Sequence, residues 1–316
     1  MTMPDFNAEP LLHVEGLKQY FRISSTYTTK AVDGISFDIY PGETYGLVGE
    51  SGSGKSTTGR ALIRLYDPTG GKIIFDGHDI SGKMTKEDER YLRTNMQMIF
   101  QDPMACLNPR KKVKEIIAQG LEIHHMYKDQ ADLDEKVNTI LEKVGLSREH
   151  ATRYPQPFSG GQRQRIGIAR ALVLNPKLVI ADEAISALDV SIQAQVVNLM
   201  KDLQDELGTT YLFIAHDLSM VKYISDRIGV MHLGHMVETG TTDEIFKNPV
   251  HPYTKSLLSA IPKPNPRVEK NRIALTYDKK KEGVDYTVGT VHKLTDTHSV
   301  LATDEEFERW IKDTSY

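Results

Sequence analysis

The 316-residue chain contains a single cysteine, Cys106. One thiol cannot form an internal disulfide, a cysteine zinc site or an iron–sulfur cluster ligated by this chain, so those scaffolds are excluded. No uninterrupted apolar run approaches the ~18 residues of a membrane span, and the first ten residues lack the basic start and apolar stretch of a signal peptide. We therefore expect a protein that stays in the cytoplasm and does not cross a membrane by itself.

An excess of positive charge is also missing. The 39 Lys and Arg residues are outnumbered by 43 Asp and Glu residues, for a formal net charge of −4. Sequence-independent binding to nucleic acid needs a clustered basic surface, so we expect no nucleic-acid partner. The length allows one large domain or two ordinary ones, at ~100–200 residues per domain.

Hydrophobic patterning divides the first 240 residues into strand-like and helical stretches. Between Lys112 and Pro157 the apolar residues recur at helical spacing, which predicts a small helical lobe. Strands that alternate with helices after this lobe predict a parallel sheet with helices on its faces, whereas the early strands predict an antiparallel sheet. The predicted strands are 11–14, 31–39, 44–48, 72–75, 177–181 and 210–215, and a helix is predicted over about 192–206.

The last quarter of the chain has a different character. Prolines recur at short intervals in Asn248–Pro252 and in Ile261–Pro266, which predicts an extended linker or strap because proline interrupts helices and central strands. From Arg267 onward the sequence mixes both signs of charge with strand-like patches and an amphipathic turn around Phe307 and Trp310. We predict an appended segment here and assign it no function.

A phosphate-binding loop follows the predicted strand at residues 44–48. The segment Gly49-Glu-Ser-Gly-Ser-Gly-Lys-Ser56 fits the pattern G-x-x-x-x-G-K-[ST]. Its glycines let successive N–H groups face phosphate oxygens, while Lys55 reaches the β- and γ-phosphates of ATP, Ser56 ligates Mg²⁺ and Thr57 contacts the α-phosphate. The predicted nucleotide-binding residues are Gly49, Glu50, Ser51, Gly52, Ser53, Gly54, Lys55, Ser56 and Thr57.

Two adjacent acids end the apolar run Leu178–Ala181. Such a strand is buried on both faces, so carboxylates at its end are costly unless they face a cation or a site. Beside the phosphate loop, Mg²⁺ is the natural partner of Asp182. Glu183 points elsewhere and is positioned to polarise the water that attacks the γ-phosphorus.

Four further motifs narrow the class. Phe158-Ser-Gly-Gly-Gln162 resembles the signature motif of ATP-binding cassette (ABC) ATPases, and Gln101, Ser186-Ala-Leu-Asp189 and His216 resemble that family's Q-loop, D-loop and switch histidine. The resemblance implies an α/β fold of the phosphate-loop NTPase type, with a RecA-like parallel core, an antiparallel β subdomain and an inserted helical subdomain at about 102–165. It implies an ATPase domain over residues 1–245 and a C-terminal extension over 246–316.

The family resemblance also implies roles for individual residues. Glu183, His216 and Gln101 would be catalytic, with Gln101 a further Mg²⁺ ligand. An upstream aromatic side chain would stack on adenine, and Phe21 is favoured over Tyr20 for this role. A second cassette would bind head to tail, so that the signature residues act on nucleotide held by that partner; these residues are Ser159, Gly160, Gly161 and Gln162.

A subset of motifs is similar to one branch of importer ATPases. Leu107-Asn-Pro-Arg110, Ser186–Gln193 and above all His251-Pro-Tyr-Thr254 through Pro262 look like the oligopeptide/dipeptide branch, and most like its F-type subunit. That resemblance implies a D-type ATPase partner forming a heterodimer, two membrane permeases, an extracellular peptide-binding lipoprotein and a place on the cytoplasmic face of the membrane. Dipeptides, nickel chelates, antibiotics or sugars remain alternative solutes, and a soluble non-transport ABC ATPase or a non-hydrolysing regulatory subunit are alternative functions. Ala184, where the family usually has proline, is expected to loosen the site without abolishing it.

Overall fold

An antiparallel sheet is built from the first quarter of the chain. Its strands alternate buried and exposed side chains, and Asp76 and Gly77 join the last two with the positive φ angles of 50° and 80° that a tight hairpin turn requires. The computed structural model describes residues 5–6, 8–262, 274–312 and 314. In spatial order the strands are β2 (Thr28–Ile39), β1 (Leu12–Arg22), β4 (Gly70–Phe75) and β5 (His78–Asp79).

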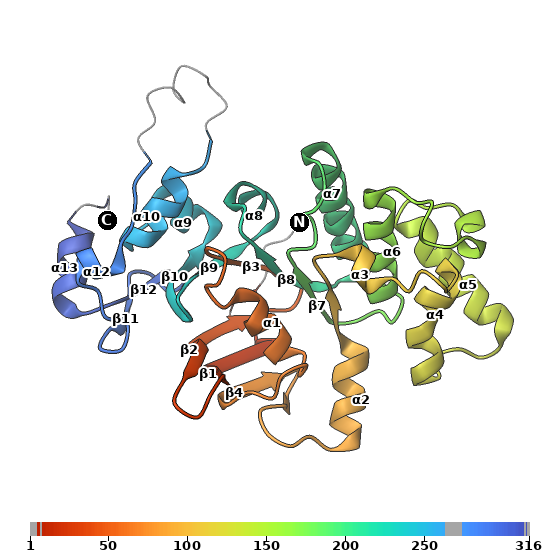
Figure 1. Ribbon diagram of the computed structural model, residues 1–316, viewed down its shortest axis with the longest axis horizontal. Helices are drawn as coiled ribbons and strands as arrows, with labels where there is room; N and C mark the ends of the chain where they lie inside the picture. Colours follow the sequence, from red (N-terminus) through yellow and green to blue (C-terminus); the bar gives the residue numbers. More distant parts are fainter. Residues whose placement is uncertain (1–4, 7, 263–273, 313, 315–316) are drawn as a thin grey trace.

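The second sheet runs through the centre of the molecule (Figure 1). Its middle strands pair in parallel, and β3, β7 and β8 are buried at every residue, as expected for strands covered on both faces. The predicted strands 44–48 and 210–215 are confirmed residue by residue. In spatial order the strands are β11 (Thr290–Lys293), β12 (Ser299–Ala302), β10 (His235–Thr241), β9 (Arg227–His232), β3 (Thr44–Val48), β8 (Thr210–Ala215), β7 (Leu178–Asp182) and β6 (Met96–Ile99).

Two apolar cores cover the two faces of this sheet. On β7, Leu178 and Ile180 pack into the core shared with the antiparallel sheet, whereas Val179 and Ala181 pack into the core shared with the helices of the other face. This two-residue alternation places one core on each side of the parallel strands. The helices that flank the sheet are α1 (Lys55–Leu62), α2 (Lys86–Asn95), α7 (Val190–Leu207) and α8 (Leu218–Ile224).

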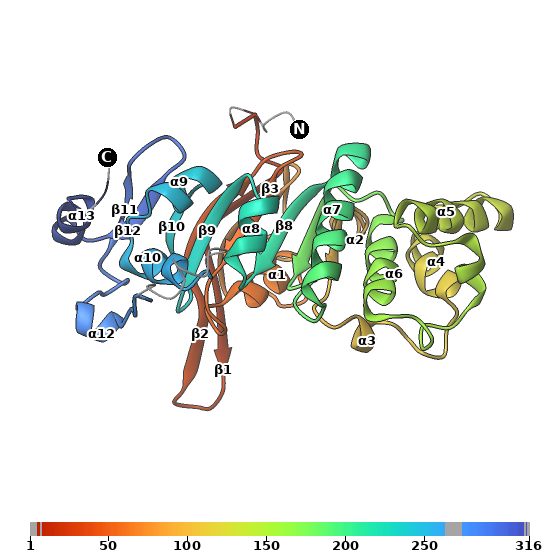
Figure 2. The ribbon, with the colours of Figure 1, turned by 90° about the horizontal axis from the view of Figure 1, so that it is seen from above.

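A helical lobe projects from one end of the central sheet (Figures 1 and 2). The helical spacing predicted between Lys112 and Pro157 is confirmed in α5 (Gln130–Lys143), where the regularly spaced Leu133, Val137, Ile140 and Leu141 are all buried. The confirmed architecture is therefore an α/β fold with a parallel core, an antiparallel subdomain and an inserted helical lobe. The lobe contains α3 (Pro103–Cys106), α4 (Val113–His124), α5 (Gln130–Lys143), the 3₁₀ helix η1 (Arg148–Thr152) and α6 (Gly160–Leu172).

The C-terminal region corrects one sequence prediction. The extended strap over Asn248–Pro252 is wrong at its end, because Pro252 occupies the first turn of a helix, where its missing N–H is not needed. The second proline-rich segment, Ile261–Pro266, lies outside the described residues from 263 onward. The tail joins the core, since β12 pairs with β10 and extends the central sheet. The helices here are α9 (Thr242–Lys247), α10 (Pro252–Ser259), α12 (Lys279–Glu282) and α13 (Asp304–Ile311).

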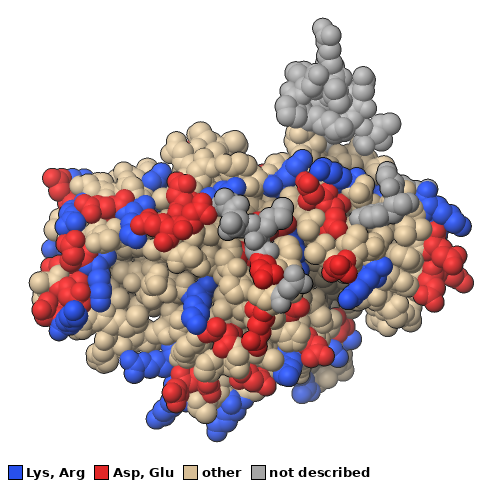
Figure 3. Space-filling view, turned by 180° about the vertical axis from the view of Figure 1, so that it is seen from behind, with Lys and Arg blue, Asp and Glu red and all other residues tan. Residues whose placement is uncertain are grey.

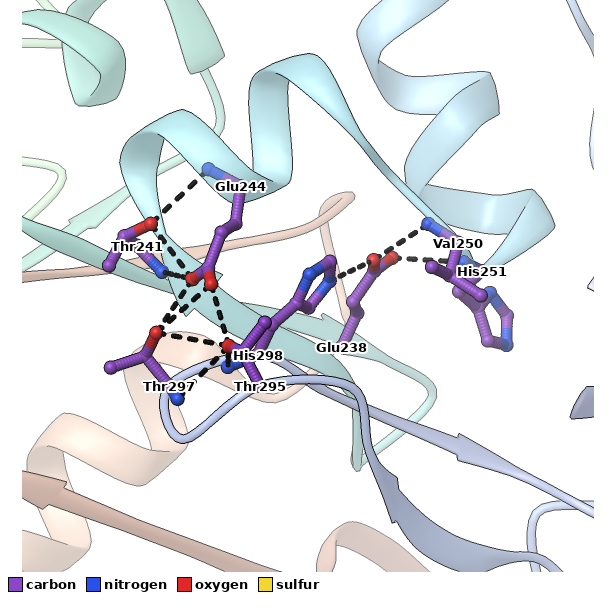
Figure 4. Close-up of polar contacts among 8 residues, drawn as sticks. All are labelled: Glu238, Thr241, Glu244, Val250, His251, Thr295, Thr297 and His298. Carbon is purple, nitrogen blue, oxygen red and sulfur yellow. Dashed lines mark hydrogen bonds and ion pairs between the residues drawn. The ribbon is translucent and has the colours of Figure 1, made fainter. Parts of the chain in front are cut away.

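Two buried or half-buried glutamates attach the tail to the core (Figure 4). Glu238 on β10 accepts hydrogen bonds from the backbone N–H groups of Val250 and His251, and its carboxylate lies 2.8 Å from Nε2 of His298 in the tail. Glu244 on α9 accepts from the hydroxyls of tail residues Thr295 and Thr297. The tail is therefore held by polar contacts as well as by strand pairing.

The distribution of surface charge and the hydropathy of the helices can be compared with the sequence analysis. Lys and Arg are interspersed with Asp and Glu over the face seen in Figure 3. Among the described helices, none is long and apolar enough to cross a membrane.

Candidate functional site

The phosphate loop connects β3 to α1 and depends on its glycines. Gly49 and Gly54 have φ angles of 152° and 107°. A Cβ at Gly49 would lie 2.1 Å from the carbonyl oxygen of Met231, and one at Gly54 would lie 2.3 Å from that of Ala31. The loop is therefore wrapped too tightly for any other residue at these two positions, as a cradle for phosphate oxygens requires.

Lys55 is folded back over this loop. Its ammonium group donates to the carbonyl oxygens of Gly49 and Glu50, both at 2.8 Å, and lies 3.4 Å from Oγ of Ser53. Burial lowers the pKa of Lys55, against the opposing effect of the carboxylates of Glu183, Asp182 and Glu50. A buried cation inside a tightly wrapped glycine loop fits the β- and γ-phosphates of a nucleotide.

Ser56 and Asp182 meet beside the loop. The Ser56 hydroxyl donates to Oδ1 of Asp182 at 2.6 Å, and Arg60 approaches the other carboxylate oxygen at 3.5 Å. Burial raises the pKa of Asp182, and the Ser56 hydrogen bond opposes that shift. A hydroxyl and a carboxylate oxygen in contact are the ligand types that Mg²⁺ takes beside nucleotide phosphates. These two residues therefore fit the predicted metal.

Glu183 is the centre of a second group of side chains. Nε2 of Gln101 donates to its Oε2 at 2.7 Å, and Nδ1 of His216 lies 3.8 Å from its Oε1. A cavity of about 50 Å³ adjoins Glu183, Ser186 and His216, which is room for a water molecule. The structure thus brings the three predicted catalytic residues together. The hydrogen bonds of Gln101 go to Glu183 and Ser186 rather than to the Ser56–Asp182 pair.

The signature residues lie on a separate surface. Ser159 caps α6 by accepting from the N–H of Gln162, whose side chain accepts from the N–H of Ser159 in return. A Cβ at Gly161 would lie 2.7 Å from Cγ2 of Ile192, whereas Gly160 is exposed. In both ribbon views α6 lies in the helical lobe with α4 and α5, apart from α1 (Figures 1 and 2). One chain therefore presents its phosphate loop and its signature motif at different places.

The two upstream aromatic candidates differ in their surroundings. Phe21 is half-buried and packs edge-on against Tyr66, with ring centroids 5.2 Å apart. The Tyr20 hydroxyl donates to Asp33, and the ammonium of Lys30 lies 5.3 Å from the Tyr20 ring. Because Tyr20 is engaged by both charged neighbours, Phe21 stays the candidate for stacking on adenine.

Sequence reasoning missed one residue at the phosphate loop. Tyr253 on α10 accepts a hydrogen bond from the backbone N–H of Glu50 at 2.8 Å. The signal that could have found it was the block His251-Pro-Tyr-Thr254, which the sequence marked only as typical of one branch. Its contact with a loop about two hundred residues earlier depends on the tertiary fold.

Comparisons with known proteins match both parts of the chain. A family profile described as "ABC transporter" matches residues 32–186, and one described as "Oligopeptide/dipeptide transporter, C-terminal region" matches residues 237–283. The chain is 57% identical over 301 residues to the oligopeptide transport ATP-binding protein OppF of Bacillus subtilis (strain 168), which covers 95% of this chain and 98% of the relative. It is 52% identical over 317 residues to the dipeptide transport ATP-binding protein DppF of Lactococcus lactis subsp. cremoris, with both chains fully covered.

Solved structures show the same fold. The dimeric ATP-binding cassette MJ0796 in a post-hydrolysis state bound to ADP and Pi matches with a TM-score of 0.67 at 25% identity, covering 73% of this chain and 98% of that chain. The cbiO1 protein of Clostridium perfringens, part of an ABC transporter complex, matches with a TM-score of 0.67 at 28% identity, covering 76% and 91%.

Proposed function

The chain belongs to the ATP-binding proteins of ABC transporters, in the oligopeptide and dipeptide branch, and we propose that it hydrolyses ATP to power the import of oligopeptides. The observation that carries the ATPase activity is the glycine loop around Lys55 next to the group formed by Glu183, Gln101 and His216, and the peptide solute is inferred from the relatives. Together they join a phosphate cradle to a carboxylate suited to polarise water.

Different residues of this chain bind the phosphates, the adenine ring and the metal ion of the nucleotide. Amides of the loop and the ammonium of Lys55 bind the phosphates, and Phe21 stacks on the adenine ring. Ser56 and Asp182 would hold Mg²⁺, whereas Gln101, expected from the sequence as a further ligand, contacts Glu183 and Ser186 instead; when bound, the ion neutralises charge on the phosphates. The 2.6 Å contact between Ser56 and Asp182 supports this pairing.

Glu183 is the proposed general base, and His216 the proposed contact to the γ-phosphate. Gln101 holds the Glu183 carboxylate in one orientation through its 2.7 Å hydrogen bond. A carboxylate fixed beside a water-sized cavity is suited to accept the proton of an attacking water.

The separation of the phosphate loop from α6 supports a dimer. Ser159, Gly160, Gly161 and Gln162 act on nucleotide bound by a second cassette, and that cassette's signature completes the site of this chain. We assign the partner as a D-type ATPase subunit in a head-to-tail heterodimer. The pair sits on the cytoplasmic face of the membrane beneath two permease subunits, which receive peptide from an extracellular binding lipoprotein.

Two experiments test the assembly and its solute. Affinity purification of the tagged chain from its native membranes should recover a second ABC ATPase and two integral membrane proteins; recovery of neither contradicts the importer assignment and favours a soluble ABC ATPase. Cells that lack the gene should lose uptake of labelled tetra- or pentapeptides. Loss of dipeptide, nickel-chelate or sugar uptake instead assigns the alternative solute, an outcome that the DppF relative makes worth measuring.

A further inference from the structure

The C-terminal region contacts the phosphate loop through Tyr253. The hydroxyl oxygen of Tyr253 lies 2.8 Å from the backbone nitrogen of Glu50, and the carbonyl oxygen of Glu50 lies 2.8 Å from Nζ of Lys55. A single residue of the loop is therefore held on one side by α10 and on the other by the phosphate-binding lysine. The Glu50 N–H also shares its peptide plane with the Gly49 carbonyl oxygen, which accepts from Nζ of Lys55 at 2.8 Å, so rotation of that plane disturbs both contacts.

The Tyr253 ring is fixed by an aromatic cluster that we define as His232, Tyr253, Tyr277 and Tyr286. The His232 ring packs on Tyr253 with centroids 4.2 Å apart, and the Tyr277 ring lies 5.6 Å away. Nδ1 of His232 lies 2.6 Å from the Tyr286 hydroxyl, which lies 3.2 Å from that of Tyr277. Two of the four members belong to the tail beyond α10, so the tail packs directly behind the residue that contacts the loop.

A second set of contacts fixes the start of α10. Glu238 accepts from the N–H groups of Val250 and His251 and contacts His298 of the tail (Figure 4). The imidazole of His251 in turn accepts from the N–H of Tyr253 at 3.0 Å. The backbone of Tyr253 and its ring are therefore both immobilised before its hydroxyl meets Glu50.

We propose that Tyr253 is a positioning residue for ATP binding, and that the C-terminal region is thereby a structural part of the nucleotide site. The inference rests on the assignment of the loop around Lys55 as the phosphate site. The hydroxyl satisfies the Glu50 N–H and so orients the Gly49–Glu50 peptide, whose carbonyl oxygen, that of Gly49, accepts from Lys55 at 2.8 Å. Without it the start of the loop gains freedom, and the amides that follow must be ordered when the phosphates bind, which weakens affinity.

The test compares variants of the full chain in the assembled transporter. Tyr253→Phe removes the hydroxyl and keeps the ring; Tyr277→Phe removes a hydroxyl of the same cluster that does not contact the loop; Lys55→Ala removes the phosphate-binding cation. We expect Tyr253→Phe to raise KM for ATP about three- to ten-fold, the effect of one net hydrogen bond, with a smaller change in kcat. Tyr277→Phe should stay within about two-fold of wild type.

A spectroscopic readout separates positioning from general destabilisation. The amide proton resonance of Glu50 should move upfield in Tyr253→Phe and stay in place in Tyr277→Phe. Wild-type KM and an unmoved Glu50 amide in Tyr253→Phe, with binding lost in Lys55→Ala, overturn the inference. Wild-type ATP binding by Lys55→Ala overturns the assignment of the loop instead. Should Tyr253→Phe fail to fold, Tyr286→Phe removes the hydrogen bond to His232 behind the ring; the Glu50 amide resonance should move in this variant and not in Tyr277→Phe, and an unmoved resonance refutes the proposal.

Discussion

Replacement of Glu238 by alanine should lower the free energy of unfolding more than the replacement of an exposed residue does. The carboxylate is buried at 0% exposure and accepts two backbone N–H groups, from Val250 at 2.8 Å and from His251 at 3.0 Å. Alanine leaves both donors buried without that acceptor, at about 1–3 kcal/mol each, and removes the contact with His298. We expect the free energy of unfolding to fall by about 3–5 kcal/mol, the range for breaking a buried charged contact.

The assay is urea and thermal unfolding of the full chain at pH 7.5. At roughly 2–4 °C per kcal/mol, Tm should fall by about 10 °C. Glu308→Ala is the matched control, because Glu308 is exposed on α13 and its loss should change stability by no more than about 0.5 kcal/mol. Glu238→Gln keeps the shape and one acceptor and should lie between the two. A loss below about 1 kcal/mol in Glu238→Ala would refute the reasoning that this carboxylate holds the region together.

Three further predictions concern ATP hydrolysis, nucleotide binding and the stability of the protein at acidic pH. Glu183→Gln should retain ATP binding while the hydrolysis rate falls about 10²- to 10⁴-fold; phosphate release checks this, and unchanged turnover contradicts the general-base assignment. Gly49→Ala should abolish nucleotide binding in an equilibrium titration, because its Cβ would meet the Met231 carbonyl at 2.1 Å, whereas Gly52→Ala, strained at φ 81° with open space around it, should weaken binding less. Burial lowers the pKa of His232 from 6.5 to about 4 and of His251 to about 3. Both imidazoles are neutral in the fold and are protonated more readily in the unfolded chain. The free energy of unfolding is therefore highest above pH 6.5 and falls as the pH drops below it, by up to ~1.4 kcal/mol per pH unit for each histidine. Equal urea midpoints at pH 7.5 and 5.5 would contradict this prediction.

The parts of the fold that the sequence predicted correctly depend on local patterns. The strand before the phosphate loop is a continuous apolar run that ends at a glycine loop, and both its bounds and the loop's tight wrapping followed from residue type alone. The buried face of α5 followed equally from its 3.6-residue period.

The contacts that the sequence could not give join residues far apart in the chain. Gln101 and Glu183 meet across 82 positions, and Tyr253 meets Glu50 across 203. The pairing of β12 with β10 likewise depends on where the central sheet leaves an open edge, which no local pattern encodes. The strap prediction was wrong at Pro252 because proline was taken as a helix breaker, whereas this residue stands in the first turn of a helix, where proline is favoured.

Ala184 stands where the family usually has proline, which raises the question of what holds the backbone of Glu183. Glu183 has a φ of +47°, a conformation that costs a residue with a side chain about 1–3 kcal/mol and persists only where neighbours enforce it. Its N–H donates to the carbonyl oxygen of Ile214, and its own carbonyl oxygen accepts from both the N–H and the hydroxyl of Ser186. Gln101 fixes the carboxylate, and the Ala184 side chain is buried. Hydrogen bonds on both sides of Glu183 thus hold its backbone without a proline at position 184, so we expect the alanine to leave the proposed general base in place.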